Sequence, residues 1–425
     1  MNNFTKKQTK KNVIFAALQI IINGLLLFVF YKYLIKVIGV ELIGVWSLVM
    51  AFSSFLRAGN FGFADSIVKF VSTSIAHNDL SKVVRIIKTS FTSVFIMLGL
   101  LLLFAYPILY KILPHFLSTQ YIILALELLP YSLVSVWLAV LSLLVIFSFD
   151  GINRVDIRSG FLVISNIFLI LLSILFVHFY GFIGLGYAQV LQSTIQLLTA
   201  WFLIKKQLNI QSATPFFWDK ALFKEMFLYS FHLQIASFLA MMLEPMSKIF
   251  LGYFGSMSSV GYFDMANKLI MQVRNVVVNA NQALVPMLSK AHAEHVNITK
   301  SYFTTFKVLL VFSVVFYISV ALLINFISNI WIGHIEPIFI NFSYIVLVSI
   351  AINTLAGAAY FTNISIGDVK YNMQSQMIIA GLNVLLGLVL GYFFKDYGVV
   401  AAYGVSIGIG SYWLMYDFYK RRAYD

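Results

Sequence analysis

The chain has 425 residues, of which 61% are hydrophobic and 11% charged. Soluble domains carry about 25% charged residues, so this composition excludes an ordinary soluble protein. The chain contains no cysteine, which excludes disulfides, thiolate catalysis and Cys-bound zinc. The net charge of +13 comes from basic residues that mostly flank apolar runs. There they act as topology signals beside anionic headgroups, so we expect membrane lipids and no nucleic acid as partners.

Twelve apolar stretches are each long enough to cross about 30 Å of hydrocarbon as a helix. A β-barrel would show short alternating segments instead. The sequence therefore predicts an all-α polytopic membrane protein. The predicted spans are about 13–35, 42–75, 89–113, 121–149, 159–179, 184–204, 226–253, 258–291, 302–330, 337–364, 371–394 and 399–419.

Lysine and arginine are distributed unevenly between the two sides of these spans. The termini and the loops after every second span hold 19 of them, and the other loops hold three. Basic residues accumulate on the cytoplasmic side of membrane proteins. Both termini are therefore predicted to be cytoplasmic.

The second half of the sequence repeats features of the first at an offset of 216 or 217 residues. The turn that begins at Gly39 matches one that begins at Gly255, and Tyr180-Gly181 matches Tyr397-Gly398. Such a constant offset indicates an internal duplication. Each copy has six spans, so the copies share one orientation and are related by an axis along the membrane normal. We predict two parallel six-helix bundles, 1–212 and 213–425, with a central cavity between them.

Basic residues occupy matched positions in the two halves. Lys32 corresponds to Lys248, and Arg57 corresponds to Arg274. A charged side chain deep in a span costs about 3 kcal/mol or more on insertion scales, so it should face water or an anion. These four residues are the predicted substrate-binding set, and arginine in particular binds phosphate oxygens through forked hydrogen bonds. The alternative is that each arginine is neutralised by a distant carboxylate or a helix C-terminus.

Other charges within the spans are candidates for ion coupling or for cavity charge. Three acids precede a lysine by four residues, which is the favourable order for a helical ion pair, whereas Glu127 has no basic residue within one turn. These candidates are Asp65, Lys69, Glu127, Glu244, Asp264 and Lys268. The sequence contains no P-loop, so ATP is not the direct energy source. It also suggests no catalytic residue, metal site or cofactor.

Three segments carry a family resemblance: Ile38-Gly-Val-Glu-Leu-Ile-Gly44-Val-Trp46-Ser-Leu, Ala58-Gly-Asn-Phe-Gly62-Phe-Ala-Asp-Ser and Ser74-Ile-Ala76. Together they resemble the start of Wzx-type polysaccharide flippases of the multidrug/oligosaccharidyl-lipid/polysaccharide exporter superfamily. Lys69 stands near a basic position of these proteins. The resemblance implies a MATE-like fold in the bacterial cytoplasmic (inner) membrane.

The resemblance also implies a function in O-antigen, lipopolysaccharide or capsule biosynthesis. An undecaprenyl-pyrophosphate-linked oligosaccharide would be flipped from the inner to the outer leaflet by alternating access. Arg57, Arg274 and Lys32 would attract the pyrophosphate while the polyprenyl tail stays in lipid. The implied partners are this lipid-linked oligosaccharide, a polysaccharide polymerase and other assembly proteins.

Two alternatives stay open at this point. A multidrug exporter of the same superfamily would need unpaired carboxylates for cationic drugs, whereas the unpaired groups at mid-depth here are basic. A membrane glycan polymerase or ligase would carry a long outer loop with catalytic polar residues, whereas the outer loops here are short.

Overall fold

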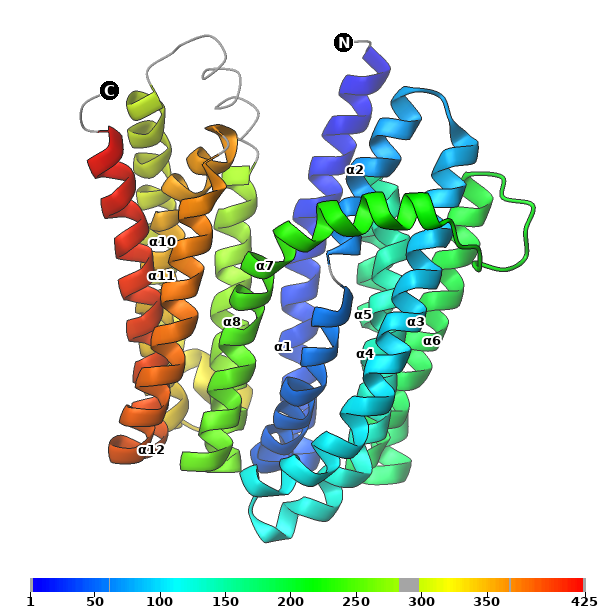
Figure 1. Cartoon of the computed structure of the whole chain (residues 1–425). Helices are drawn as coiled ribbons and strands as arrows, with labels where there is room; N and C mark the ends of the chain where they lie inside the picture. Colours follow the sequence, from blue (N-terminus) through cyan, green and yellow to red (C-terminus); the bar gives the residue numbers. More distant parts are fainter. Residues whose placement is uncertain (1–2, 61, 283–297, 367, 423–425) are drawn as a thin grey trace. The chain divides into compact units, whose positions relative to one another are not determined.

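The computed structural model describes residues 3–60, 62–282, 298–366 and 368–422 (Figure 1). All regular elements within these ranges are helices. They are α1 (Asn3–Ser54), η1 (Phe55–Asn60), α2 (Phe63–Ala76), α3 (Leu80–Ile112), η2 (Leu113–Phe116), α4 (Thr119–Gly151), α5 (Val155–Tyr180), η3 (Gly181–Ile183), α6 (Gly184–Gln207), α7 (Lys220–Phe254), α8 (Met257–Gln282), α10 (Ile298–Ile332), α11 (Pro337–Ile366) and α12 (Val369–Arg422).

The predicted number of about twelve transmembrane helices is confirmed by helix lengths and breaks. In the described part of the chain, seven helical stretches are long and apolar enough to cross a membrane, and three of them have 47, 53 and 53 residues. One crossing needs about 20 residues, so each of these three holds two spans. They are interrupted by Gly39 (φ 81°) in α1, by η3 between α5 and α6, and by Lys395 (φ 55°) in α12. The predicted spans 226–253 and 258–291 fall on α7 and α8, the latter as far as residue 282.

The second predicted span, 42–75, is wrong as a continuous helix. The first helix ends at Ser54, the 3-10 helix η1 follows, and α2 begins at Phe63 after Gly62, whose φ is 75°. Glycine adopts this left-handed conformation at little cost, so Gly62 permits the break. Irregular backbone at membrane depth occurs where protein or water, rather than lipid, satisfies its polar groups. Arg57 lies on this interrupted segment.

The helices form two compact units whose limits differ from the predicted bundles 1–212 and 213–425. Unit 1 comprises Met1–Phe30 and Val49–Ile235, and unit 2 comprises Tyr31–Leu48 and Ala236–Asp425. The first half of α7 thus belongs to unit 1, and the region around the Gly39 break belongs to unit 2. This division reflects packing, and the two six-helix halves inferred from the repeat stay a prediction.

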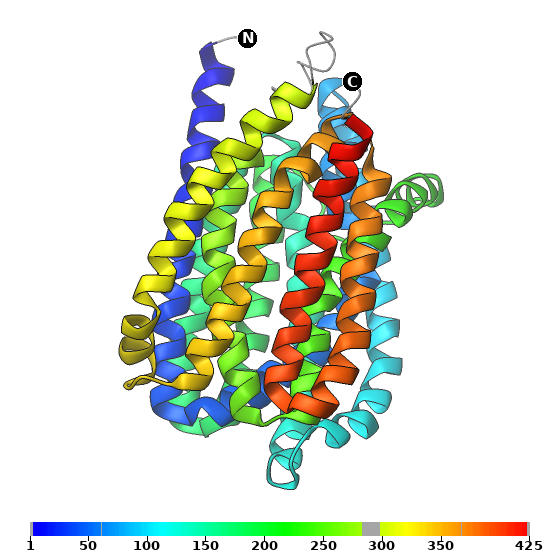
Figure 2. The ribbon, with the colours of Figure 1, turned by 90° about the vertical axis from the view of Figure 1, so that its left-hand side faces the viewer.

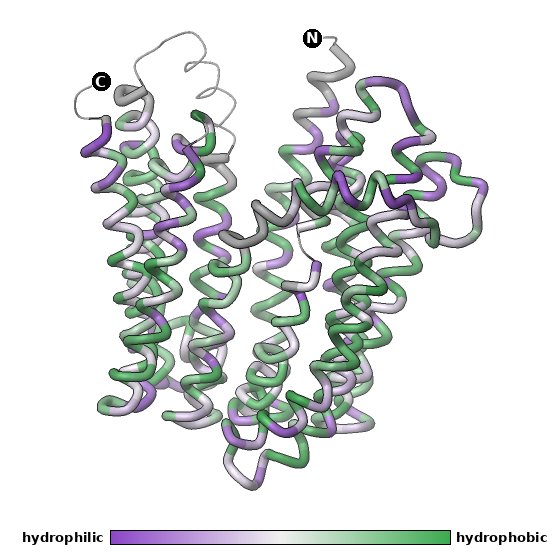
Figure 3. Tube along the Cα trace, viewed as in Figure 1, coloured by the Kyte–Doolittle hydropathy of each residue, from purple (hydrophilic) through white to green (hydrophobic). Residues whose placement is uncertain are grey.

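Unit 1 has a core centred on the packing of α4 against α6. Leu128, Leu144 and Leu185 are completely buried there. A Cβ on Gly186 would lie 2.9 Å from the Cβ of Tyr131, so glycine at this position lets α6 approach α4 closely. The outward faces carry exposed apolar side chains, and apolar residues run along the middle of the helices (Figure 3). This pattern fits helices surrounded by lipid.

Unit 2 contains α8, α10, α11 and α12, of which the last three lie side by side (Figure 2). The repeat-related glycines Gly44 and Gly261 also meet in this unit. A Cβ on Gly44 would lie 1.8 Å from the carbonyl oxygen of Met257, and a Cβ on Gly261 would lie 2.6 Å from that of Val40. The two equivalent turns therefore pack backbone to backbone, and both positions require glycine.

Candidate functional site

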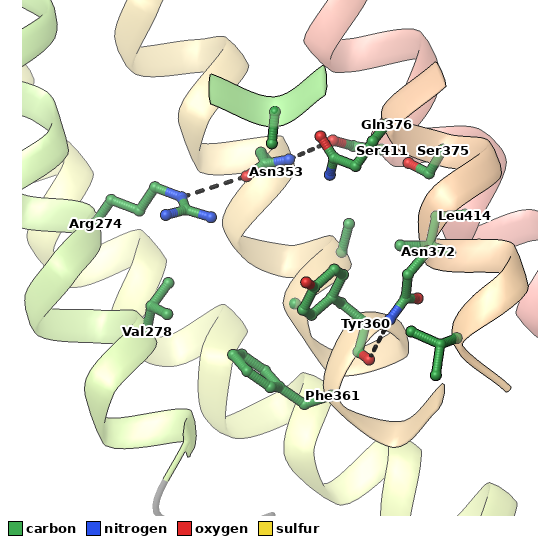
Figure 4. A pocket seen from close by; sticks show the side chains of 14 residues that line it. Arg274, Val278, Asn353, Tyr360, Phe361, Asn372, Ser375, Gln376, Ser411 and Leu414 are labelled. Atoms are coloured by element: carbon green, nitrogen blue, oxygen red, sulfur yellow. Dashed lines mark hydrogen bonds between the residues drawn. The ribbon is translucent and has the colours of Figure 1, made fainter. Parts of the chain in front are cut away.

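A polar pocket of about 420 Å³ lies inside unit 2 (Figure 4). Helix α8 supplies Arg274, α11 supplies Asn353 and Tyr360, and two separate parts of α12 supply Gln376 and Ser411. The volume falls in the range of small-molecule sites, about 300–1,000 Å³. Because all of these residues belong to unit 2, the pocket is complete within that unit.

Helical spacing brings these polar groups onto the walls of the pocket. Asn353 and Tyr360 are seven residues apart on α11, which places them on one face of the helix. Asn372, Ser375 and Gln376 follow an i, i+3, i+4 spacing at the start of α12 and line the pocket from that side. The polar side chains of each helix thus face the pocket, and its apolar side chains pack against other helices or face lipid.

Arg274 is held by a short chain of hydrogen bonds. Its Nε donates to Oδ1 of Asn353 at 3.3 Å, and Nδ2 of Asn353 donates to Oγ of Ser411 at 3.0 Å. The two terminal amino groups of the guanidinium make no hydrogen bond with any described residue. Arg274 is therefore anchored through one nitrogen, while its two terminal nitrogens stay available for a ligand.

Most other polar groups of the pocket are bonded within the protein. Ser375 Oγ donates to the carbonyl oxygen of Gly410 at 2.8 Å. Asn372 Nδ2 donates to the carbonyl oxygen of Tyr360 at 2.9 Å. Among the described residues, neither the carboxamide of Gln376 nor the hydroxyl of Tyr360 has a hydrogen-bond partner. The groups open to a ligand are thus those of Arg274, Gln376 and Tyr360.

The electrostatic character of the pocket follows from its lining. Arg274 contributes a permanent positive charge, and the described lining residues include no aspartate or glutamate. A guanidinium partly removed from water attracts an anion more strongly than one in bulk solvent, because the local dielectric is lower. The arrangement can therefore bind one phosphate or carboxylate group beside neutral hydrogen-bonding groups.

Lys248 lies outside this pocket, in a buried ion-pair network of unit 2. Its Nζ is 2.6 Å from Oδ1 of Asp264 and also pairs with Glu244. Lys268 Nζ is 3.2 Å from the same Asp264 oxygen, and the hydroxyl of Tyr31 donates to the other. The predicted pairs Glu244–Lys248 and Asp264–Lys268 are confirmed, whereas the contacts of Asp264 with Lys248 and Tyr31 were not predicted. The side chain of Lys248 is only 6% exposed and is bonded to two carboxylates, and its predicted role in substrate binding stays a prediction.

The other two predicted substrate-binding residues do not line the Arg274 pocket. Arg57 is an exposed residue of η1 in unit 1, and Lys32 is an exposed residue of α1 in unit 2. Their substrate-binding roles stay predictions, as does a cavity between the two halves. Of the four predicted residues, Arg274 alone lines this pocket.

The remaining candidates belong to unit 1. Lys69 is exposed, and its Nζ lies 3.7 Å from the centroid of the Tyr229 ring, a cation–π contact. Glu127 is exposed on α4 and forms no ion pair with the described residues. The side chain of Asp65 lies outside the described part of the structure, so the predicted Asp65–Lys69 pair is untested.

Sequence reasoning missed the neutral residues of the pocket. Asn353, Gln376 and Ser411 are uncharged, and charge was the signal that selected Arg274. A usable signal was the cluster Asn372, Ser375 and Gln376 within an otherwise apolar span. Polar side chains in a span usually face the bundle interior, so such a cluster indicates an internal polar wall.

Comparison with known proteins gives both a family and a fold. The sequence profile of the family described as polysaccharide biosynthesis protein matches residues 9–292. No curated protein sequence matches the chain. The structure of lipid II flippase MurJ in an inward closed conformation has a TM-score of 0.71 at 16% identity, and the match covers 98% of this chain and 87% of that one.

Two further solved structures share the fold. A mutant of the Vibrio cholerae MATE transporter VcmN has a TM-score of 0.69 at 11% identity, with 100% of this chain and 99% of that chain covered. A MOP superfamily transporter from Pyrococcus furiosus, described as having a binding pocket of reverse polarity, has a TM-score of 0.64 at 13% identity, with 96% and 95% covered.

At such identities these structures establish the MATE-like fold and nothing more specific. The family profile covers well over half of the chain. The protein is therefore a polytopic membrane protein that belongs to the polysaccharide biosynthesis protein family.

Proposed function

We propose that the protein is a flippase that moves an undecaprenyl-pyrophosphate-linked oligosaccharide from the inner to the outer leaflet of the bacterial cytoplasmic membrane by alternating access. The observation that carries this proposal is the Arg274 pocket, with its free guanidinium nitrogens and acid-free lining. A phosphate oxygen pair fits a guanidinium fork in a bidentate manner. The family and the MATE-like fold support a transport function of this kind.

In this proposal the charged residues have different roles. Arg274 binds a phosphate group inside unit 2, and Arg57 and Lys32 attract the pyrophosphate from exposed positions. The polyprenyl tail stays in the lipid, because the polar pocket offers it no favourable surroundings. Both termini face the cytoplasm, and a polysaccharide polymerase and other assembly proteins receive the translocated product.

A multidrug exporter of the same superfamily is less well supported. Cationic drugs would require a carboxylate in the site, and the described lining of the pocket has none. The acids Asp264 and Glu244 are engaged with lysines.

Glu127 forms no ion pair with the described residues. We propose that its carboxylate carries the proton that is coupled to transport. Replacement of Glu127 by glutamine should then change the pH dependence of transport.

The proposal is tested by glycan export in a strain whose own copy of the gene is deleted. We expect Arg274→Ala to lower surface polysaccharide roughly tenfold or more, because a charge-assisted hydrogen bond contributes about 1.5–3 kcal/mol. The control is Ser319→Ala, which removes an exposed hydroxyl on α10 outside the pocket that donates to the carbonyl oxygen of Val315 on the same helix. Membrane insertion and thermal unfolding of both variants are measured in parallel. Normal export by a correctly inserted Arg274→Ala protein would refute the proposed role of the pocket.

A further inference from the structure

The pocket has more hydrogen-bonding capacity than a phosphate group requires. The guanidinium of Arg274, the carboxamide of Gln376 and the ring of Tyr360 lie around the same space (Figure 4). Arg274 is the single cationic residue among the described lining residues. One phosphate group beside Arg274 would leave Gln376 and Tyr360 unused.

We propose that Gln376 and Tyr360 form a subsite for the sugar attached directly to the phosphate, and that Asn353 positions Arg274 beside this subsite. The proposal rests on the function proposed above and specifies how the head group is recognised. It assigns the phosphate to α8 and the sugar to α11 and α12. Different residues of one pocket then bind the phosphate and the sugar.

Hydrogen-bond chemistry supports a sugar rather than a second anion at Gln376 and Tyr360. A carboxamide offers both donors and an acceptor, and a phenol hydroxyl can do either. An ionised phosphate only accepts hydrogen bonds, so it would leave the carbonyl oxygen of Gln376 without a donor. A sugar hydroxyl both donates and accepts, and it therefore satisfies both residues. The lining residues Ala356, Gly357 and Leu414 are uncharged and cannot balance a second phosphate.

Asn353 has a different role because both ends of its carboxamide are already engaged. Its Oδ1 accepts from Arg274, and its Nδ2 donates to Ser411. Ser411 is almost fully buried and fixes the far end of this chain. Asn353 is thus a positioning residue that directs the terminal nitrogens of Arg274, and it need not touch the sugar.

The test compares two probes on the full-length protein in lipid nanodiscs. One probe is undecaprenyl diphosphate, and the other is the same lipid carrying a single N-acetylhexosamine. We expect Gln376→Leu to weaken binding of the sugar-bearing probe about tenfold, equivalent to about 1.4 kcal/mol, and to leave the bare diphosphate unchanged. Tyr360→Phe should act in the same direction with a smaller change. Ser319→Ala is the control, because Ser319 is exposed on α10 outside the pocket and donates to the carbonyl oxygen of Val315 on the same helix; it should alter neither dissociation constant.

Arg274→Ala should weaken both probes, because both carry the phosphate. Asn353→Ala should also weaken binding of both probes when Arg274 is present. In a protein that already carries Arg274→Ala, adding Asn353→Ala should have little further effect on binding. A positioning role predicts this non-additivity, whereas an independent packing defect would add to the loss. Full additivity would overturn the role of Asn353.

The sugar subsite is overturned if Gln376→Leu weakens both probes equally, or if neither Gln376→Leu nor Tyr360→Phe affects the sugar-bearing probe. These outcomes leave the proposed function standing as long as Arg274→Ala stops glycan export. Conversely, Arg274→Ala could export glycan normally while Gln376→Leu weakens binding of the sugar-bearing probe alone. That result would refute the proposed function and support the sugar subsite. The two failures are therefore distinguishable.

Discussion

Repeat-related basic residues have different surroundings in the two halves of the protein. Lys32 is exposed on α1, whereas its counterpart Lys248 is buried and paired with Glu244 and Asp264. Arg57 lies on the 3-10 helix η1 of an interrupted span, whereas Arg274 lies on the continuous helix α8. A duplicated sequence thus supplies matched positions, and the neighbours of each position decide what the charge does.

The neighbours of the two arginines also differ. With the offset of 216 or 217, Asn353 corresponds to Trp137 or Val136 in the first half, and Tyr360 corresponds to a leucine. The two polar positions that α11 contributes to the pocket are therefore apolar at the equivalent places in the first half. Under the proposed function, this difference predicts that Arg274 contributes more than Arg57 to binding of the head group.

The largest effect should come from the buried ion network. Lys248→Ala leaves two carboxylates without their shared cation, and breaking a buried ion pair from one side costs about 3–5 kcal/mol. Thermal unfolding in detergent should show a strongly lowered midpoint. Lys32→Ala, at the matched exposed position, should change stability by less than about 0.5 kcal/mol. Equal losses of stability in Lys248→Ala and Lys32→Ala would contradict the difference between the two positions.

The two arginines should respond differently to lysine. Arg274→Lys loses the planar nitrogen that bonds Asn353 and the bidentate fork but keeps the charge, so we expect transport to fall roughly tenfold, or about 1.4 kcal/mol, and no further than in Arg274→Ala. Arg57→Lys preserves the charge at an exposed site, and transport should fall much less. The measurement is glycan export at matched protein levels. Comparable losses in both variants would indicate that both arginines recognise phosphate in the same manner.

Glycines mark the place where the two halves should behave alike. Gly44→Ala and Gly261→Ala each place a Cβ within 2.6 Å of a backbone oxygen. Overpacking of this kind costs about 1–3 kcal/mol. Both should lower the unfolding midpoint by similar amounts, whereas Gly160→Ala, where a Cβ meets nothing within 4 Å, should not. A large difference between Gly44→Ala and Gly261→Ala would contradict their equivalent packing.

The smallest expected effect concerns the helix break in the first half. Gly62 has φ 75°, a conformation that costs a non-glycine residue roughly 1–2 kcal/mol. Gly62→Ala should lower stability by about this amount, as measured by thermal unfolding. It should also reduce export, because the alanine favours a continuous helix past Arg57. Unchanged stability and export would show that the break contributes little.

Sequence patterns predicted the spans and the local ion pairs because both depend on nearby residues. Apolar runs gave about twelve crossings, and i, i+4 spacing gave the Glu244–Lys248 and Asp264–Lys268 pairs. The contacts of Asp264 with Lys248 and Tyr31 join residues 16 and 233 positions apart. Such contacts depend on how helices pack, which no local pattern specifies.

The interruption of the second span and the pocket walls were missed for related reasons. The apolar residues around Gly62 hide a backbone break in any average over a span. Asn353 and Gln376 carry no charge, and their effect on hydropathy is diluted by apolar neighbours. Arg274 was found because a guanidinium in the middle of an apolar span is costly enough to be noticed alone, whereas the groups that orient it are identified only by the packing of the helices.

The central claim is that Arg274 binds the phosphate of a lipid-linked sugar during its passage across the membrane. Its most direct test is translocation of a fluorescent undecaprenyl-diphosphate glycan in proteoliposomes containing the full-length protein. We predict that the unmodified protein and Ser319→Ala move the lipid between leaflets, and that Arg274→Ala slows this at least tenfold while remaining folded. Translocation by Arg274→Ala at the rate of the unmodified protein would contradict the claim.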